Sequence, residues 1–159
     1  MRYLQILILI FAAIFISGCA STRGFKADSF VSPLPVAVLP VNNMSNDLKS
    51  ASMFRELFKN SLQDLGYSVA KNCDVDYLLQ QNGLTDGGQL TNIPPEKLCS
   101  MLGVDAVFIG NLEKAGQVTT GVYNKKQVKA DMKLYRKSDL LWADTAEASE
   151  KDFGLDSKA

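Results

Sequence analysis

The chain has 159 residues, with 17 basic and 17 acidic side chains, and 47% of its residues are hydrophobic. This composition is enough for one globular core, and the balanced charge argues against a nucleic-acid partner. The sequence contains no histidine, which removes the commonest general base and the commonest zinc ligand. We therefore expect a protein that is not an enzyme and that needs no metal or cofactor.

The first 18 residues have the pattern of a secretory signal peptide. Arg2 is followed by an apolar run from Tyr3 to Ile16, interrupted only by Gln5. The run is shorter than the ~20 residues of a membrane-spanning helix. A cationic start, a short apolar middle and small residues at the end are typical of an export signal.

The four residues Ile16, Ser17, Gly18 and Cys19 resemble the lipobox of bacterial lipoproteins. This resemblance implies that residues 1–18 are removed and that Cys19 carries a diacylglycerol thioether and an amide-linked acyl chain such as palmitate. Each buried methylene adds ~0.8 kcal/mol, so several chains give a stable anchor. Ala20 stands where lipoproteins of the inner membrane typically have Asp, which favours the outer membrane. The alternative is a plain signal peptide or membrane anchor with a chance cysteine.

Residues 19–34 are polar and lack a sustained period, so we expect a flexible tether with a reach of ~20 Å before a single domain at 35–159. The apolar run 36–39 lies between two prolines and predicts a buried strand. A helical face follows from Leu48, and Gly66 is placed to end it. The members of this face are Leu48, Ala51, Phe54, Phe58, Leu62 and Leu65. Residues 67–70 predict a second, parallel strand.

The middle of the chain predicts two shorter helices. The first turns Val75, Leu78 and Leu79 inward and ends at Gly83, and residues 84–90 form a loop. In this reading Asp74 and Asp76 are helix-start acids, which favour the helix dipole. The second helix begins at the Asn92–Glu96 stretch, because proline is tolerated in a first turn, and ends at Gly103. A strand covered on both faces follows at 106–109.

The last third of the chain alternates apolar and polar residues over 128–135, which predicts a half-exposed strand. A turn at 136–139 and a return strand at 140–148 complete a hairpin, with Trp142, Ala146 and Ala148 facing inward. The predicted fold class is α/β, a mixed sheet with two or three helices.

Three further features are candidates for function. Cys73 and Cys99 could form a disulfide in an oxidising compartment, or they could be two separate buried thiols. Asn42, Asn43 and Met44 follow the carboxyl end of a parallel strand, where open α/β sheets place binding crevices, and they form a candidate partner-binding loop. Ordinary turn chemistry is the alternative for this loop.

Several stretches resemble a family of bacterial lipoproteins of undefined function. They are VAVLPVNN at 36–43, QNGLTD at 81–86, PPEKL at 94–98 and GVDAVFIGNL at 103–112, together with the C-terminal hairpin. The resemblance implies a fold similar to the N-terminal domain of TolB, the periplasmic domain of CsgG and auxiliary components of ABC transporters. It also implies a periplasm-facing outer-membrane lipoprotein that works through protein contacts, and it brings no catalytic residue.

The resulting functional hypothesis is an accessory component of an envelope export or assembly system. The alternative is a regulator of a cell-wall (peptidoglycan) synthase, because lipoprotein activators of those enzymes are similar in fold. The expected partners are the outer membrane, through the acyl chains on Cys19, and envelope proteins. The sequence leaves open whether the protein forms a homodimer.

Overall fold

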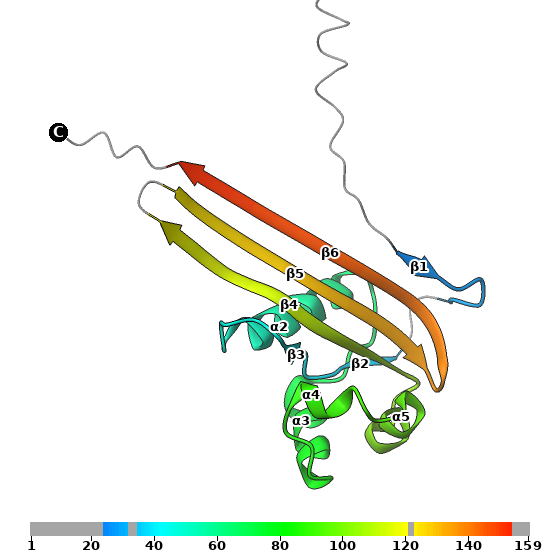
Figure 1. Ribbon diagram of the computed structural model, residues 1–159. Coiled ribbons are helices and arrows are strands. Elements are labelled where there is room, and N and C mark those ends of the chain that lie inside the picture. Colours follow the sequence, from blue (N-terminus) through cyan, green and yellow to red (C-terminus); the bar gives the residue numbers. More distant parts are fainter. Residues whose placement is uncertain (1–23, 32–34, 121–122, 154–159) are drawn as a thin grey trace, which may run out of the picture.

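The computed structural model describes residues 24–31, 35–120 and 123–153 (Figure 1). The elements in chain order are β1 (Phe25–Lys26), β2 (Val36–Val38), β3 (Asn42–Asn43), α2 (Ser50–Asp64), α3 (Asn72–Gln81), α4 (Gly87–Leu90), α5 (Pro95–Leu102), β4 (Ala106–Thr120), β5 (Tyr123–Arg136) and β6 (Asp139–Phe153). The strands form one mixed sheet in the order β1-β6-β5-β4-β2, with β3 also beside β4. The predicted α/β class is confirmed, with four helices in the described residues instead of two or three.

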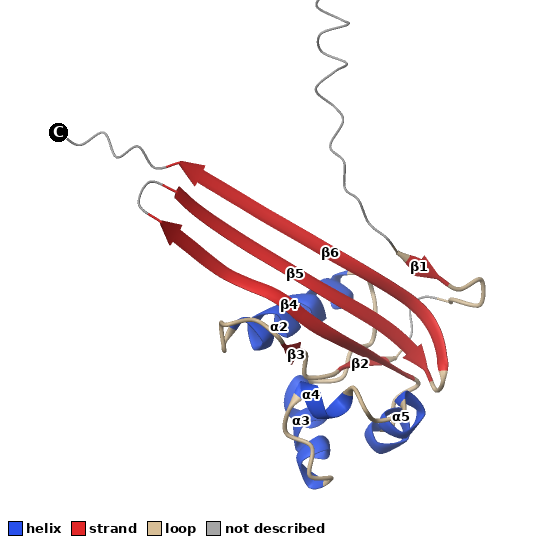
Figure 2. Ribbon diagram, viewed as in Figure 1, coloured by secondary structure: helices blue, strands red, loops and turns tan. Residues whose placement is uncertain are grey.

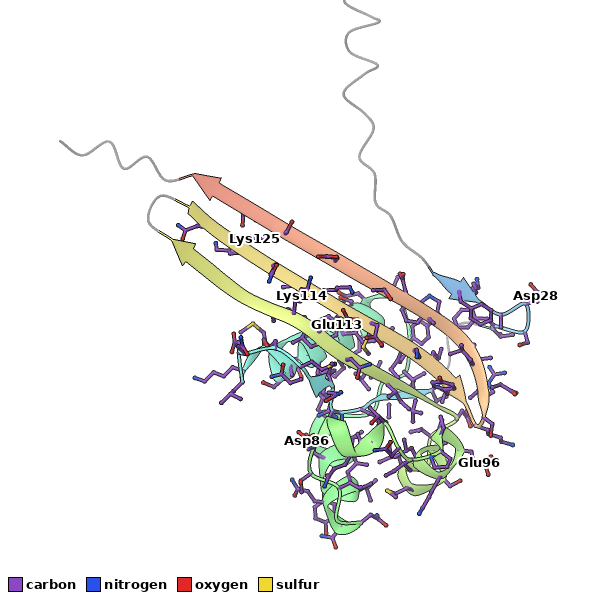
Figure 3. The ribbon with its side chains drawn as sticks, in the orientation of Figure 1. Asp28, Asp86, Glu96, Glu113, Lys114 and Lys125 are labelled. Carbon is purple, nitrogen blue, oxygen red and sulfur yellow. The ribbon has the colours of Figure 1, made fainter. Side chains whose placement is uncertain are left out.

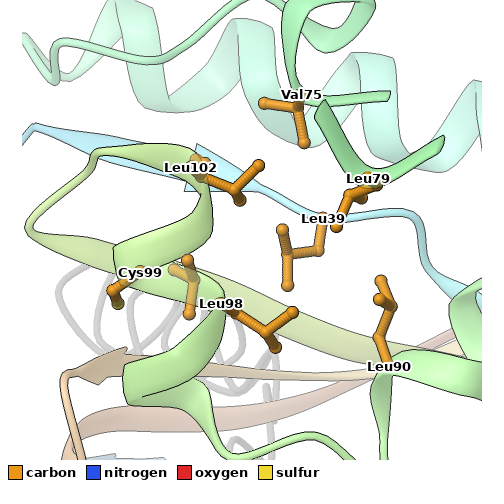
Figure 4. Packing of buried hydrophobic residues seen from close by; sticks show 9 residues of the cluster. Leu39, Val75, Leu79, Leu90, Leu98, Cys99 and Leu102 are labelled. Atoms are coloured by element: carbon orange, nitrogen blue, oxygen red, sulfur yellow. The ribbon is translucent and has the colours of Figure 1, made fainter. Parts of the chain in front are cut away.

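The sheet is covered on both faces at one end only. On one face, the side chains of Val36, Val38 and Phe108 pack with α2 residues such as Leu62. On the other face, Ala37, Leu39 and Val107 pack against α3, α4 and α5 (Figure 4). The helices gather around this end, and the far halves of β4, β5 and β6 project beyond them (Figure 2).

The strand β2 is the buried parallel strand that the sequence predicts. All three of its residues are buried, and it pairs in parallel with β4 in the register Val36↔Ala106. The predicted second strand at 67–70 is reduced to a single parallel bridge between Val36 and Val69. The β2 edge is therefore largely without a neighbouring strand in the described residues.

The helix α2 is shorter than its apolar period suggests. Phe54, Phe58 and Leu62 pack against the sheet as predicted. Leu48 and Leu65, however, are 90% and 71% exposed, because one precedes the helix and the other stands at its C-cap. Gly66 ends the helix with φ of +87°, a left-handed conformation that favours glycine.

The predicted loop at 84–90 contains a short helix, α4. Asp86 accepts a hydrogen bond from the Gly88 amide at 2.7 Å, and Gln89 Oε1 accepts from the Asp86 amide at 3.1 Å. These bonds form a capping box, in which the two side chains satisfy amides of the first turn. Gly87 is buried and lies against the backbone of Val41, so its role is close packing as well as turning.

The C-terminal hairpin is confirmed, but its strands are much longer than predicted. β5 and β6 pair over 14 and 15 residues and turn at the Arg136↔Asp139 pair, where Lys137 has φ of +53°. Trp142 is half-buried and packs edge-on against Phe108, with ring centroids 6.0 Å apart. The predicted inward positions of Ala146 and Ala148 are wrong: both are exposed, because no helix covers that part of β6.

Part of the predicted tether belongs to the folded domain. Phe25 and Lys26 form β1 and pair antiparallel with Ala143 and Trp142 of β6. Phe30 packs on the α2-side core, and the Lys26 ammonium lies 5.0 Å from the centre of its ring. The folded part that the structure describes thus includes residues about ten positions before Pro35. Cys19 and the signal-peptide residues 1–18 lie outside the described residues.

Candidate interaction surface

The face of the sheet that contacts α2 continues beyond that helix as an apolar surface. On this face Ala115 of β4 pairs with Val128 of β5, and Val128 pairs with Ala148 of β6. Ala146 lies on the same face of β6, two residues before Ala148 and closer to the helices. Val128 is 43% exposed, and both alanines of β6 are exposed. We call these four residues the sheet platform. Ala115 is half-buried against the core beside α2, whereas Val128, Ala146 and Ala148 form an exposed apolar patch. Beyond the patch, Lys126 and Glu150 lie on the same face, 3.9 Å apart.

The platform exists because β4 contains a bulge. The register shifts between Leu112 and Lys114, so Glu113 is an extra residue. Leu112 faces α2 in the core, and after the bulge Ala115 faces the same side. A bulge redirects the side chains that follow it, and here it keeps the apolar row on the α2 side.

Both edges of the projecting sheet lack a strand partner in the described residues. On β6 the pairing with β1 ends at Ala143. On β4 the pairing with β3 ends at Leu112, whose carbonyl accepts a last bond from the Met44 amide at 2.9 Å. Unpaired edges offer backbone hydrogen bonds to another chain.

The opposite face of the projecting sheet is charged. Figure 3 labels Glu113 and Lys114 on β4. Lys129 on β5 forms an ion pair with Glu113, and Lys114 lies 3.9 Å from Glu147 on β6. The hydrogen bond that Lys129 donates to the Glu113 carboxylate raises the pKa of Lys129, since it favours the charged ammonium. Positive and negative groups alternate here, so this face does not form a basic patch.

The predicted partner-binding loop mostly stabilises the sheet. Asn42 and Asn43 form β3, and the Asn42 amide donates to Asn111 Oδ1 at 2.9 Å. Asn111 in turn donates to the Asp131 carboxylate at 3.0 Å, which links three adjacent strands. Asn43 Oδ1 also accepts from the Ser45 amide at 3.0 Å, which is the turn chemistry of the alternative, and partner binding by this loop stays a prediction. Met44 differs, because it is 64% exposed at the base of the projecting sheet.

A buried arginine is the polar feature that the sequence reasoning missed. Arg55 on α2 is only 6% exposed, and its Nε donates to the Val38 carbonyl at 2.9 Å, on the edge strand β2. Its Nη1 donates to the Asp76 carboxylate on α3 at 2.7 Å. Asp76 is therefore an ion-pair partner and not simply a helix-start acid. Arg55 could have indicated this ion pair in the sequence, because it is a charged residue next to Phe54 on the apolar face of the helix.

The two cysteines of the domain are free thiols in different environments. Cys73 on α3 is exposed, and Cys99 on α5 is buried in the core that α3, α4 and α5 cover. The disulfide alternative is not formed in this structure. The prediction of two buried thiols is right for Cys99 and wrong for Cys73. Burial raises the pKa of the Cys99 thiol.

The described residues contain no group of three or more His, Cys, Asp or Glu side chains that could hold a metal ion. Among the helices in the described part of the chain, none is long and apolar enough to cross a membrane.

Comparison with known proteins gives the family of this chain. The family model described as "Putative lipoprotein GNA1162-like" matches residues 25–158. The chain therefore belongs to the GNA1162-like family, and the resemblance to a lipoprotein family is confirmed. No curated protein matches the sequence.

Solved structures show the same fold. The lipoprotein GNA1162 from Neisseria meningitidis matches with a TM-score of 0.70 and 25% identity, over 79% of this chain and 88% of that one. A dodecamer-forming PelC from Paraburkholderia phytofirmans matches with a TM-score of 0.58 and 15% identity, over 81% and 82%. The LpoB C-terminal domain from Salmonella enterica matches with a TM-score of 0.55 and 17% identity, over 77% and 87%. The last two similarities are similarities of fold.

Proposed function

We propose that this protein is a lipid-anchored, non-enzymatic component of the bacterial envelope that acts through protein contacts. In this proposal Cys19, following Ile16, Ser17 and Gly18, holds the domain at the outer membrane, facing the periplasm. The domain serves as an accessory part of an export or assembly system. Membership of a lipoprotein family supports the anchor, and the sheet platform is the observation that supports the contact function.

The chemistry of the projecting sheet favours a protein partner. Its α2-side face has the apolar platform bordered by the Lys126–Glu150 ion pair, its edges have unpaired backbone groups in the described residues, and its other face has charges of both signs. A nucleic acid or an anionic lipid surface requires a surplus of positive charge, which this sheet does not have. A protein can use the apolar face and the edges together.

A second candidate function is the regulation of a cell-wall synthase. The sequence resemblance suggests this class, and the fold is shared with the LpoB C-terminal domain. The two candidates differ in the partner and not in the surface, so one experiment distinguishes them. The PelC dodecamer, which has this fold, supports including a second copy of the chain among the outcomes.

Site-specific photocrosslinking in the native host tests the proposal. A photoreactive residue at Val128 reports on the platform, and the same residue at Gln127 is the matched control. These neighbours face opposite sides of the sheet, because successive residues of a strand such as β5 point to opposite faces. We expect one defined crosslinked protein from position 128 and at least severalfold less of it from position 127.

The identity of the crosslinked protein decides between the candidates. An export or assembly component supports the first function, a cell-wall synthase supports the second, and the chain itself supports self-association. Equal and diffuse crosslinking from both positions would contradict the proposed contact surface. Val128→Lys should weaken the same complex, because it places a charge in an apolar contact.

A further inference from the structure

A pocket opens on the α2 side of the sheet, between α2 and the segment that begins with β1. Its volume is about 340 Å³, within the ~300–1,000 Å³ of pockets for small organic ligands. Three buried core residues, Leu62 of α2, Phe108 of β4 and Leu134 of β5, form its floor. The floor is therefore apolar and is fixed by the packing of the domain.

Aromatic side chains form the walls of the pocket. Four half-buried rings contribute: Phe30, Phe58, Tyr67 and Trp142. The rings of Phe58 and Trp142 both pack edge-on against Phe108, with centroids 5.1 Å and 6.0 Å apart. Because core contacts already hold these two rings, little side-chain freedom is lost when an apolar ligand enters.

One positive charge lies at the rim of the pocket. Lys26 is exposed and is the one charged side chain among the described residues of the lining. Its ammonium lies 5.0 Å from the centre of the Phe30 ring, and it forms no ion pair with a described residue. A ligand with an apolar body and a single negative group is complementary to this arrangement, whereas a cationic ligand would be repelled.

The helix wall of the pocket favours an alkyl chain over a polypeptide. The Leu65 amide donates to the Ser61 carbonyl at 3.2 Å, and the Ser61 hydroxyl donates to the Leu57 carbonyl at 3.0 Å. The Tyr67 amide likewise donates to the Leu62 carbonyl at 3.0 Å, so these polar groups are already bonded. A buried peptide group needs hydrogen-bond partners, whereas an alkyl chain needs none. Such a chain would also cover Leu65, which is 71% exposed at the rim.

We propose that this pocket binds a fatty acid, with its alkyl chain between the aromatic walls and its carboxylate at the Lys26 ammonium. The volume is near the lower end of the range for small-ligand sites, so a chain of medium length fits it best. The inference goes beyond the proposed function, because it involves neither a protein partner nor a residue of the sheet platform.

Trp142 allows a direct test, because it lines the pocket and is the only tryptophan of the chain. The full-length protein, purified from its host and held in phosphatidylcholine nanodiscs, is titrated with 10-bromodecanoate, whose bromine quenches an indole that it touches. Empty nanodiscs measure the share of each probe that enters lipid. We expect saturable quenching that unbrominated decanoate reverses. Binding of 10-bromodecanol should be about two- to fivefold weaker, because an exposed ion pair contributes little more than this.

Two matched variants locate the site. Ser61→Phe places a ring at the rim of the pocket, whereas Asn60→Phe places the same ring at the preceding residue of α2, which does not line it. Both positions are exposed, so the fold should tolerate either ring. We expect binding of 10-bromodecanoate about tenfold weaker in Ser61→Phe and unchanged in Asn60→Phe.

The role of the charge is tested separately at Lys26. In Lys26→Met the acid should bind no more tightly than the alcohol, because the alkyl stem is kept and the ammonium is lost. Lys26→Arg keeps the charge and should keep the preference for the acid. A purely structural effect of the substitution would instead weaken both probes by the same factor.

Four results would overturn the inference. Absence of saturable quenching would mean that no alkyl chain enters the pocket, and equal quenching in the Ser61 and Asn60 variants would place the chain elsewhere. Equal binding of the acid and the alcohol by the unchanged protein would exclude the pairing with Lys26. If the peptide acetyl-Leu-Phe-Asp displaced the probe more strongly than decanoate, the pocket would be a site for a protein side chain. None of these results depends on crosslinking from Val128, so the proposed function is tested independently.

Discussion

The contrast between Cys73 and Cys99 gives a prediction at the scale of single residues. The thiolate is the reactive form of cysteine, and burial both hides Cys99 and raises its pKa. At any pH below that raised pKa, Cys99 therefore has a smaller thiolate fraction than an exposed cysteine. We expect a maleimide reagent to modify Cys73 rapidly and Cys99 slowly in the folded protein. The rate of modification of Cys99 should rise only at higher pH, because its thiolate forms there. Mass spectrometry of tryptic peptides measures both sites.

Denaturation provides the control for this prediction. In urea the two thiols should react at similar rates, because the burial that distinguishes them is lost. Equal rates in the folded state would contradict the buried position of Cys99. A disulfide would instead protect both residues until a reductant is added.

Gly87 gives a second residue-scale prediction, because its lack of a side chain is required by the neighbouring backbone. A Cβ at this position would lie 2.5 Å from the Val41 carbonyl carbon and 2.5 Å from the Asn42 nitrogen. Backbone atoms cannot move aside as a flexible side chain can, so Gly87→Ala should lower the free energy of unfolding by about 1–3 kcal/mol. Urea denaturation measures the change. Gly24→Ala is the control, since its nearest neighbour would be 3.6 Å away.

At the scale of elements, α4 depends on its first residue. Asp86 caps the helix through its bond to the Gly88 amide. Asp86→Ala should lower the free energy of unfolding by about 1 kcal/mol, and Asp86→Asn should lower it less, because an amide oxygen still accepts the bond. Equal losses in the two variants would show that the cap does not account for the effect of Asp86.

The same element shows why the sequence analysis missed part of the fold. Residues 86–89 read Asp-Gly-Gly-Gln, in which Asp and Gln have capping-box spacing, yet two glycines argue for a turn. β2 was predictable because burial on both faces gives a continuous apolar run, and the inward face of α2 was predictable because burial on one side imposes a period. The outer ends of β4, β5 and β6 have no core to impose one, so the predicted strands stop at residues 109, 128 and 148, short of the true ends.

The candidate sites likewise differ in whether they depend on a local sequence pattern or on the packed structure. The lipobox depends on four consecutive residues and can be recognised in the sequence. The sheet platform depends on a register shift at Glu113 and on where α2 ends, and neither is encoded in a local pattern. The Arg55–Asp76 pair joins residues 21 apart on two helices, so only the packed structure brings it together.

At the scale of the whole molecule, β1 determines how the domain is held. Five residues separate Cys19 from Phe25, so an extended chain between them spans at most about 20 Å. β1 runs antiparallel to β6, and Gly24 lies beside Asp144. The chain therefore enters the fold along the edge of the projecting sheet. If Cys19 is lipidated as proposed, the domain stays close to the membrane.

The anchor is the prediction on which this arrangement depends. Cys19→Ala should abolish labelling by radioactive palmitate and leave the uncleaved precursor, because the thiol that accepts the diacylglycerol is gone. Ala20→Asp should leave labelling intact and move the protein toward the inner membrane in a sucrose gradient. Labelling that persists without Cys19 would place the lipid elsewhere. An unchanged distribution of the Ala20 variant would separate the two claims: the anchor would stand, and the outer-membrane assignment would not.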